Sequence, residues 1–498
     1  MKEKEVSYIT TPIYYVNDQP HIGHAYTTIA ADVLARYHKL RGDDVFFLTG
    51  TDEHGAKIAE SAATAGVEPK AFVDKVSSQF RSAFQELNVQ FDKFIRTTDE
   101  EHERQVLVFM EKLKANGSLY EGEYEGMYCT GCEEFKTEKE LVEGKCPMHP
   151  QPIEHIKEKN WFFRLTQYLQ RVEKLIESGE LEILPKTRRE EVLGLFKQDL
   201  TDFSVSRSTV KWGIPFPGGE EQTIYVWVEA LQNYITAIGY ADNRSTFDKY
   251  WPHATHLIGK EILKFHAVYW PAMLLAAGEE APKRIIVNGH FQLNGKKMSK
   301  SLDNVIVPHD LVQKYGVDAT RYLLMSQFPF GEDGNIQADR FTEQYNADLA
   351  NGLGNLASRV LAMVTKFSGG EMPVYNQKSL TLSPRSEKAN KKYEKQIENG
   401  QFYEALKTVW SVIADANGYI QQQQPWELAK KDRQVVHQVL ADLILTLARI
   451  THMVAPFLPD TAEKLSKALI VDLSDVEALK IPPGRVFAPL EALFPRIQ

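Results

Sequence analysis

Apolar residues recur at every third or fourth position after residue 21, a spacing that predicts an amphipathic helix. The positions are Ile22, Tyr26, Ile29, Val33 and Tyr37. Arg41-Gly42 follows them, and glycine is common just beyond the end of a helix. The sequence therefore predicts one helix that starts near Ile22 and ends before Gly42.

Strand-like segments lie on both sides of this helix. EVSYITTPIYY, residues 5–15, is rich in β-branched and aromatic residues, and Val45–Leu48 is a continuous apolar run. Such a run is typical of a parallel strand buried on both faces. Strand, helix and strand together predict an α/β fold with a Rossmann-like, doubly wound parallel sheet.

The pattern changes over residues 119–221, where short strand-like segments alternate with glycine, proline and charged turns. The α/β pattern then resumes in TIYVWVEALQNYI, THLIGKEILKFHAVYWPAML and KRIIVNGHFQL. We therefore expect the sheet domain to be split by an insertion with a fold of its own.

Beyond about residue 351 the pattern is helical. One apolar stripe is formed by Val436, Leu440, Leu443, Leu447, Ile450 and Val454, with Pro456 and Pro459 after it. Steps of three and four place these side chains on one helix face, which predicts an all-α bundle.

Composition limits the class of protein. The 498 residues are enough for about three domains, and the net charge of −9 excludes a uniformly basic nucleic-acid binder but not a local basic surface. No signal-peptide pattern or membrane-length apolar run is present. The three cysteines lie close together, so we expect a cytoplasmic, reducing location rather than a disulfide framework.

His21, Gly23 and His24 stand at the start of the predicted helix, just after the first strand. A helix N-terminus favours an anion, Gly23 permits a close approach, and two imidazoles add donors. Taken alone, the histidines are more often capping or surface residues. The arrangement would suit a nucleotide triphosphate under attack at its α-phosphate.

A second cationic segment, NGKKMSKSLDN, follows the predicted strand RIIVNG and carries Lys297 and Lys300. Ammonium groups on a mobile loop can close over a pyrophosphate and neutralise its charge. By itself such a loop is usually solvated surface.

HIGH at residues 21–24 together with KMSKS at residues 297–301 resembles the class I aminoacyl-tRNA synthetases. The segments TTPIYYVNDQPHIGH, TGTDEHG, YVWVEAL, IGKEILKFHAVYWPAML and NGKKMSKS resemble the methionyl-tRNA synthetase family over nearly the whole chain. The resemblance implies that His21 and His24, with Lys297 and Lys300, are catalytic, and that Gly23 and Glu261 also contact ATP.

The resemblance also implies a methionine pocket with Asp52 binding the substrate ammonium. Its other residues would be Ile13, Tyr15, Trp227, Ala230, Leu231, Tyr234, Ile262 and His266. Apolar and aromatic walls suit a thioether, although plain core packing would explain the same residue types. Glu229 and Glu261 depart from the family, which more often has Asp at both positions. Arg207 resembles an arginine that assists near the phosphates.

Cys129 and Cys132 form C-x-x-C, and after 13 intervening residues Cys146 and His149 form C-x-x-H. Four such ligands in two knuckles suit one closed, structural zinc ion per chain, with no position left for a catalytic water. The alternative is three thiols and a surface histidine.

Asn355 and Arg359 lie four residues apart, on one face of a predicted helix, and Trp426 follows Pro425. The resemblance implies that these three residues read the methionine anticodon, because unpaired bases are recognised by stacking and by hydrogen bonds to their edges. Helix contacts and packing are the alternatives.

The family resemblance thus implies a methionine--tRNA ligase that uses ATP with Mg²⁺, carries zinc and charges elongator and initiator tRNA(Met). We expect a cytoplasmic monomer with no membrane partner. The expected domains are 1–118 and 222–296 for the sheet domain, 119–221 for the zinc insertion, 297–351 for the KMSKS loop and stem-contact region, and 352–498 for the helical anticodon-binding domain.

Three rival hypotheses remain open at this point. One is a cysteinyl-, valyl- or leucyl-tRNA synthetase. Another is a nucleotidyltransferase with the same H-x-G-H sheet, which would not need the long helical region. The third is a non-catalytic, zinc-dependent tRNA-binding protein.

Overall fold

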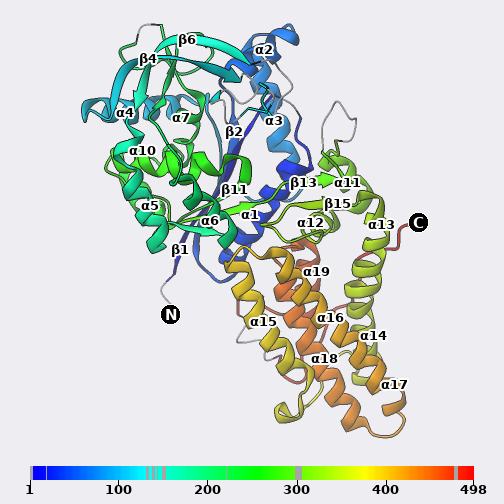
Figure 1. Ribbon diagram of the computed structural model, residues 1–498. Coiled ribbons are helices and arrows are strands. Elements are labelled where there is room, and N and C mark those ends of the chain that lie inside the picture. Colours follow the sequence, from blue (N-terminus) through cyan, green and yellow to red (C-terminus); the bar gives the residue numbers. More distant parts are fainter. Residues whose placement is uncertain are drawn as a thin grey trace.

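A computed structural model describes residues 4–17, 19–129, 134–136, 141–142, 144–147, 153–219, 221–297, 305–475 and 481–498. An α/β part and a helical part lie one beside the other (Figure 1). Within the described ranges, no helix is long and apolar enough to cross a membrane.

The centre of the α/β part is a parallel sheet, in which the described residues form six strands in the order β3-β2-β1-β11-β12-β7. Its strands are β1 Val6–Tyr15, β2 Asp44–Asp52, β3 Lys93–Arg96, β7 Glu182–Leu184, β11 Ala254–Gly259 and β12 Arg284–Asn288. The neighbours pair in parallel. Because the strand order reverses beside β1, the sheet is doubly wound, and the predicted α/β class is confirmed.

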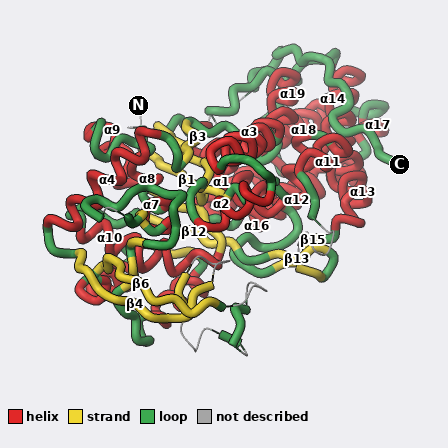
Figure 2. The backbone as a smooth tube through the Cα atoms, turned by 90° about the horizontal axis from the view of Figure 1, so that it is seen from above, coloured by secondary structure: helices red, strands yellow, loops and turns green. Residues whose placement is uncertain are grey.

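Successive residues of the buried strands pack into two hydrophobic cores, one on each face of the sheet. Ile9 and Phe47 pack on one side of the sheet, whereas Tyr8 and Leu48 pack on the other. Side chains alternate along a strand, so a run such as VFFL supplies both faces at once. Seen from above, the strands run between two groups of helices (Figure 2).

The predicted first helix is α1, Ile22–Leu40, and it connects β1 to β2 as expected. The other helices of this part are α2 Ala56–Thr64, α3 Pro69–Glu86, α4 Glu100–Ala115, α5 Leu169–Ser178, α6 Lys186–Leu195, α7 Val226–Ala230, α8 Asn233–Thr236, α9 Arg244–Tyr250 and α10 Trp270–Ala276. Residues of α1 and α3 pack in one core, and residues of α4 and α10 in the other.

The expected insertion contains an antiparallel sheet in the order β5-β4-β6-β8. Its strands are β4 Leu119–Cys129, β5 Glu134–Lys136, β6 Glu154–Phe163 and β8 Phe203–Ser204. A further pair, β9 Ser206–Arg207 and β10 Thr223–Ile224, lies at its end.

One segment of residues 119–221 departs from the expectation of a separate fold. Strand β7 pairs in parallel with β12, at the edge of the central sheet. Leu181 and Ile183 are buried there, and β12 offers backbone groups that a further strand can pair with. The sequence predicts no strand of the central sheet here, because only three strand residues lie among charged neighbours in SGELEIL.

A small sheet has the strand order β14-β13-β15. In the sequence, β13 and β14 lead into the lysine-rich loop, and β15 comes after it. Its strands are β13 Phe291–Leu293, β14 Lys296–Lys297 and β15 Gly334–Ile336. The adjoining helices are α11 Pro308–Tyr315 and α12 Val317–Met325.

The helical part contains α13 Phe341–Gln344, a π-helical stretch η8 Tyr345–Gly354, α14 Asn355–Ser368, α15 Leu382–Glu398, α16 Phe402–Gln423, α17 Pro425–Leu428, α18 Arg433–Val454 and α19 Pro459–Leu469. The apolar stripe predicted from Val436 to Val454 lies on α18, and all six of its residues are buried. The predicted all-α region is confirmed.

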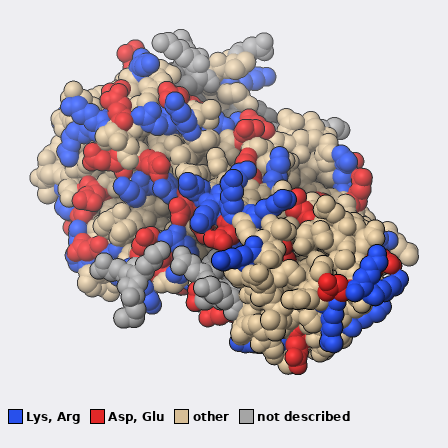
Figure 3. All heavy atoms as spheres, turned by 90° about the horizontal axis from the view of Figure 1, so that it is seen from below, with Lys and Arg blue, Asp and Glu red and all other residues tan. Residues whose placement is uncertain are grey.

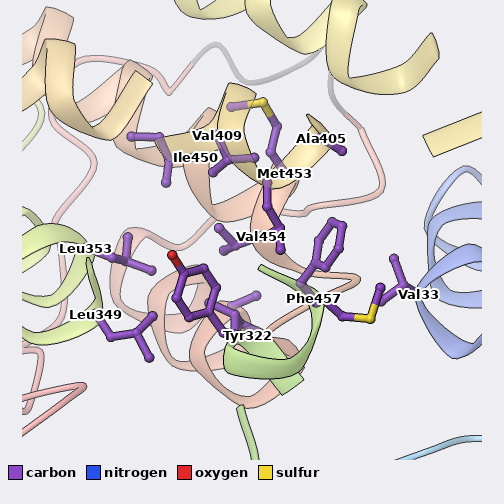
Figure 4. Close-up of a cluster of buried hydrophobic side chains, with 14 of the residues drawn as sticks. Val33, Tyr322, Leu349, Leu353, Ala405, Val409, Ile450, Met453, Val454 and Phe457 are labelled. Atoms are coloured by element: carbon purple, nitrogen blue, oxygen red, sulfur yellow. The ribbon is translucent and has the colours of Figure 1, made fainter. Parts of the chain in front are cut away.

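The two parts share a core rather than touching only at their surfaces. Val33 of α1, Tyr322 of α12, Leu353 of η8, Val409 of α16 and Phe457 after α18 belong to one buried cluster (Figure 4). The helical part therefore packs directly on the helix that begins at HIGH.

Arg321 of α12 is fully buried within this junction. Its guanidinium pairs with Asp32 of α1 at 2.6 Å and donates to the carbonyl oxygens of Leu87, Pro456 and Phe457 at 2.9–3.1 Å. A buried cation persists only when its charge and hydrogen bonds are satisfied. This residue therefore ties α1 to the end of α18.

Candidate functional site

The N-terminus of α1 holds both histidines of the predicted phosphate site. His21 Nδ1 accepts from the backbone N–H of Gly23 at 3.0 Å, and His24 Nδ1 accepts from the N–H of His21 at 3.2 Å. The two rings stack with centroids 3.8 Å apart. Because each Nδ1 is an acceptor, the neutral imidazoles carry hydrogen on Nε2, which leaves one donor per ring.

The environment keeps His24 neutral. Burial lowers the pKa of His24 well below its usual value, and the neighbouring His21 lowers it further. The site therefore offers hydrogen-bond donors at neutral pH without a fixed positive charge on His24.

The residues just before and after the lysine-rich segment contact the same helix, α1. The backbone N–H of Ile22 donates to the carbonyl oxygen of Ile306 at 3.1 Å, and Thr27 donates to Asn288 at 3.1 Å. Lys297 lies on β14 opposite Gln292. Lys300 lies outside the described residues. The structure thus places Asn288, before the lysine loop, and Ile306, after it, against α1.

Glu261 lies at the carboxyl end of β11, close to this helix end. Its Oε2 is 2.9 Å from His290 Nε2. A Cβ on Gly259 would lie 2.4 Å from Glu261 Oε1, so the carboxylate lies directly over the backbone of Gly259. The predicted ATP-contacting carboxylate is therefore next to the β12 end, where a doubly wound sheet binds its ligands.

The predicted methionine pocket gathers at the carboxyl ends of β1 and β2. Tyr15 pairs in register with Asp52, and Ile13 with Gly50. Asp52 is 6% exposed, whereas Ile13 and Tyr15 are half-buried. A carboxylate with little exposure at this edge can pair with an ammonium group.

The second group of predicted pocket residues, the Trp227 wall, lies on α7, α8 and the helical turns after β11. Trp227 is half-buried and stacks on Phe265 with centroids 4.3 Å apart. Other predicted residues of this wall are Ala230, Leu231 and Tyr234, all buried, and Ile262, half-buried.

His266 is held as a neutral side chain in this wall. Its Nδ1–H donates to the Ile262 carbonyl oxygen at 2.9 Å, so its Nε2 accepts from the Tyr234 hydroxyl at 2.8 Å. Burial lowers the pKa of His266 to about 4. Tyr234 is itself held in place, because the Tyr8 hydroxyl donates to its backbone carbonyl oxygen at 2.6 Å.

Behind this wall lies a cluster that sequence reasoning missed. Glu229 is fully buried between His54 Nδ1 at 3.0 Å and His102 Nε2 at 3.1 Å. The sequence pointed only to the unusual Glu229, because His54 and His102 are far from it in the chain. The burial of these two histidines, which marks them as partners of Glu229, is visible only in the structure.

Arg207 is 4% exposed, with its guanidinium 3.9 Å from the centroid of the Tyr225 ring. It donates to Ser204 Oγ at 3.0 Å and to the Ser206 carbonyl oxygen at 2.8 Å. With His54 and Trp212 it lines a small cavity at the base of the insertion.

Two of the four predicted zinc ligands lie within the described residues. Cys129, at the end of β4, and Cys146 are both buried. Cys132 and His149 lie outside the described residues. Among the residues that are described, no group of three or more His, Cys, Asp or Glu side chains is placed to hold a metal.

The predicted anticodon residues are on the helical part. Asn355 is exposed and Arg359 half-buried on α14, and Trp426 on α17 is 37% exposed. Helices α14 and α17 lie near each other in both ribbon views (Figures 1 and 2). An exposed tryptophan of this size is available to stack on a base.

The surface charge is uneven despite the net charge of −9. On the face seen from below, Lys and Arg side chains gather near the middle, where the larger and smaller parts of the molecule meet (Figure 3). Such a local field can attract a polyanion to an acidic protein.

Comparisons with known proteins agree with this geometry. Residues 7–152 and 150–361 match the family model described as tRNA synthetases class I (M), and residues 370–498 match the anticodon binding domain of methionyl tRNA ligase. The methionine--tRNA ligase of Caldanaerobacter subterraneus is 44% identical over 99% of this chain and 79% of its own length. That of Streptomyces coelicolor is 41% identical over 99% and 96%.

A solved structure of the Mycobacterium tuberculosis methionyl-tRNA synthetase in complex with methionyl-adenylate superposes with a TM-score of 0.94 at 36% identity, covering 99% of this chain and all of that chain. The free form of the same enzyme gives 0.87 at 32% identity, covering 100% and 99%. The sheet, the helical part and these matches together show that the chain belongs to the methionyl-tRNA synthetase family of class I tRNA synthetases.

Proposed function

We propose that this chain works as a methionine--tRNA ligase, which activates methionine with ATP and transfers it to the 3′-terminal ribose of tRNA(Met). The observation that carries the proposal is the hydrogen bond from Ile22 to Ile306, because it joins the imidazole pair to the end of the lysine loop. The chain matches methionine--tRNA ligases over 79% of the length of one relative and 96% of the length of another.

In the first step, the methionine carboxylate attacks the α-phosphorus of ATP and pyrophosphate leaves. His21 and His24 donate from Nε2 to the phosphate oxygens, while Lys297 and Lys300 neutralise the pyrophosphate. Gly23 leaves room for ATP beside the backbone, and Glu261 borders the same space. Magnesium, when bound with ATP, supplies further charge neutralisation.

Methionine is oriented by groups at the sheet edge. Asp52 accepts the ammonium group, and Trp227 and Tyr234 enclose the thioether together with the rest of the predicted pocket. The neutral His266, held by Tyr234 and Ile262, keeps this wall uncharged. An apolar wall of this kind selects by shape and by contact of sulfur with ring edges.

In the second step, the terminal ribose hydroxyl of the tRNA attacks the carbonyl carbon of the adenylate and AMP leaves. No covalent intermediate with the enzyme is required. Positioning and electrostatic stabilisation supply most of the rate enhancement.

The helical part provides the recognition of the tRNA. Asn355, Arg359 and Trp426 would read the CAU anticodon, which elongator and initiator tRNA(Met) share. Trp426 offers a ring for stacking, and the two α14 side chains offer hydrogen bonds to base edges.

Zinc would be held by Cys129, Cys132, Cys146 and His149. The donor set suits a closed tetrahedral site, and the burial of Cys129 and Cys146 agrees with ligands rather than with surface thiols. With four protein ligands the ion would stabilise the insertion and take no part in the chemistry. The domain bounds, the monomeric state and the cytoplasmic location stay predictions.

The experiment that tests the function is methionine-dependent exchange of pyrophosphate into ATP, followed by charging of a transcript with a CAU anticodon. We expect exchange with methionine and none with cysteine, valine or leucine. Exchange that depends on one of those amino acids instead, or binding of tRNA without ATP turnover, would contradict the proposal.

A further inference from the structure

The buried Glu229 joins three elements of the α/β part. It lies on α7, while His54 lies in the turn after β2 and His102 lies on α4. The three side chains are 4% exposed or less. A carboxylate so far from water must be matched by donors or by a positive charge.

The hydrogen bonds of Glu229 indicate which histidine nitrogens carry hydrogen. An ionised carboxylate only accepts, so both imidazoles donate to Glu229. His102 Nδ1 is 2.8 Å from the Thr236 hydroxyl, so both ring nitrogens of His102 have a hydrogen-bond partner. Glu229 thus takes one hydrogen bond on each oxygen.

The surroundings of His54 favour its protonated form. Burial alone would lower the pKa of His54, but Glu229, Glu103 and Glu53 outweigh burial and raise it. Its second nitrogen, Nε2, lies 3.7 Å from Glu103 Oε1. His54 and Glu229 are thus in buried contact at 3.0 Å, and the neighbouring His54 and His102 lower the pKa of Glu229 against the effect of burial.

The cluster lies behind both walls of the predicted methionine site. His54 is two residues beyond Asp52, and Glu229 is next to Ala230 and two residues from Trp227. On a helix, residues 227, 230 and 231 share one side, and residue 229 lies on nearly the opposite side. Glu229 therefore anchors the back of α7 while its front bears the pocket residues.

We propose that Glu229 is a positioning residue that, through His54, sets the distance between Asp52 and the Trp227 wall. This inference rests on the proposed function, in which Asp52 takes the ammonium group and the wall takes the thioether. The two ends of methionine would then be bound by elements that this cluster joins to each other. Misplacement by about 1 Å can reduce a rate about 10²-fold.

The carboxylate is required because of its two acceptor oxygens. In Glu229→Gln, one oxygen becomes an NH₂ group that faces an N–H of His54 or His102. Two donors would then oppose each other, and one side chain would have to turn away. The wall and the Asp52 turn would lose their fixed spacing, whereas the ATP side at α1 would be unaffected.

The test is pyrophosphate exchange by the full chain, with the methionine KM and the ATP KM measured separately. For E229Q we expect the methionine KM to rise about tenfold or more, with the ATP KM unchanged within about twofold. Glu229→Asp keeps the charge on a shorter side chain, so we expect its methionine KM to lie between those of the original chain and E229Q.

Glu279→Gln is the matched control. Glu279 is also a buried carboxylate with two cationic partners, Lys112 at 3.2 Å and Arg244 at 2.8 Å, but it follows α10, away from the pocket residues. We expect E279Q to lower the unfolding midpoint without changing the methionine KM. A rise in the methionine KM that came only from lost stability would therefore appear in both E229Q and E279Q.

Thr236→Val is a milder variant in case E229Q does not fold. It removes the hydroxyl that orients His102 and retains the shape of the side chain, so we expect a methionine KM raised about two- to fivefold. An unchanged methionine KM in folded E229Q, or in T236V, would overturn the positioning role. If the original chain showed no methionine-dependent exchange at all, the proposed function itself would fail instead.

Discussion

The backbone N–H of Ile22 donates to the carbonyl oxygen of Ile306 at 3.1 Å, although 284 residues separate them. Ile22 is the second residue of HIGH, and Ile306 follows the KMSKS segment. The segment that follows KMSKS therefore reaches the N-terminus of α1, where an anion is favoured.

Replacement of either loop lysine should slow adenylate formation. For Lys297→Ala and Lys300→Ala we expect the exchange rate to fall about 10²–10³-fold, as when one preorganised donor is removed, with little change in the methionine KM. Lys314→Ala, on the exposed side of α11, is the control and should keep the original rate. Unchanged exchange kinetics in the loop variants would refute the role of the loop.

His21→Asn should separate helix capping from catalysis. Asparagine is a preferred N-cap residue, so the start of α1 and the unfolding midpoint should stay as they are. The imidazole Nε2–H is lost, and we expect kcat for exchange to fall about 10²-fold. His21→Ala should lose both the cap and the rate. Equal activity of His21→Asn and the original chain would show that capping is the only role of His21.

Trp426→Ala should weaken charging of tRNA and spare adenylate formation. Removal of a stacking ring costs about 1–3 kcal/mol of RNA binding, so the tRNA KM should rise while pyrophosphate exchange stays constant. Val435→Ala, an exposed apolar residue at the start of α18, is the control. If both steps fall together in Trp426→Ala, the anticodon assignment is wrong.

Elemental analysis of the purified chain should find close to one zinc ion. Cys129→Ser should lose the metal and lower the stability of the insertion, because a structural zinc site contributes directly to folding. Methionine activation by metal-free protein measures whether the site is purely structural. A chain that is stable and contains no zinc would exclude the knuckle.

The free energy of unfolding should fall in mild acid because His452 is buried as a neutral ring. Burial lowers the pKa of His452 to about 4, and its Nδ1–H donates to the Leu473 carbonyl oxygen at 2.9 Å. The unfolded chain, with a histidine pKa of about 6.5, takes up the proton first. This stability is therefore full above about pH 6.5 and is lost as the pH falls towards 4.

Denaturant unfolding between pH 7 and pH 4 measures the slope, and His452→Gln should reduce it. Exposed His253 on the surface is the matched position, and His253→Gln should leave the slope unchanged. An identical slope in His452→Gln would assign the acid sensitivity to other groups.

Much of the fold could be predicted because the informative patterns are local. The period of α1 and the stripe on α18 depend only on which side chains face a core, and both helices were predicted from a few residues. The run Val45–Leu48 likewise indicated a strand in a two-sided sheet. Strand β7 was missed because three residues among charged neighbours carry too little pattern.

The candidate site, like the fold, could be predicted from the sequence only in part. The residues at the ends of β1 and β2 could be named from the family motifs, and the structure brings them together. Glu229 was noticed, but its partners could not be found. His102 and His54 lie 127 and 175 residues away from Glu229 in the sequence, and the residues around them do not indicate that they contact it.

The amino-acid sequence alone determined the element types, the split sheet domain and the chemical character of the motifs, because periodicity, burial preference and side-chain chemistry act over a few neighbouring residues. The tertiary structure decided which distant residues meet: Ile22 with Ile306, Asp32 with Arg321, and Glu229 with His54 and His102. Those contacts depend on the path of the whole chain, and each is stable only after many other segments have packed around it.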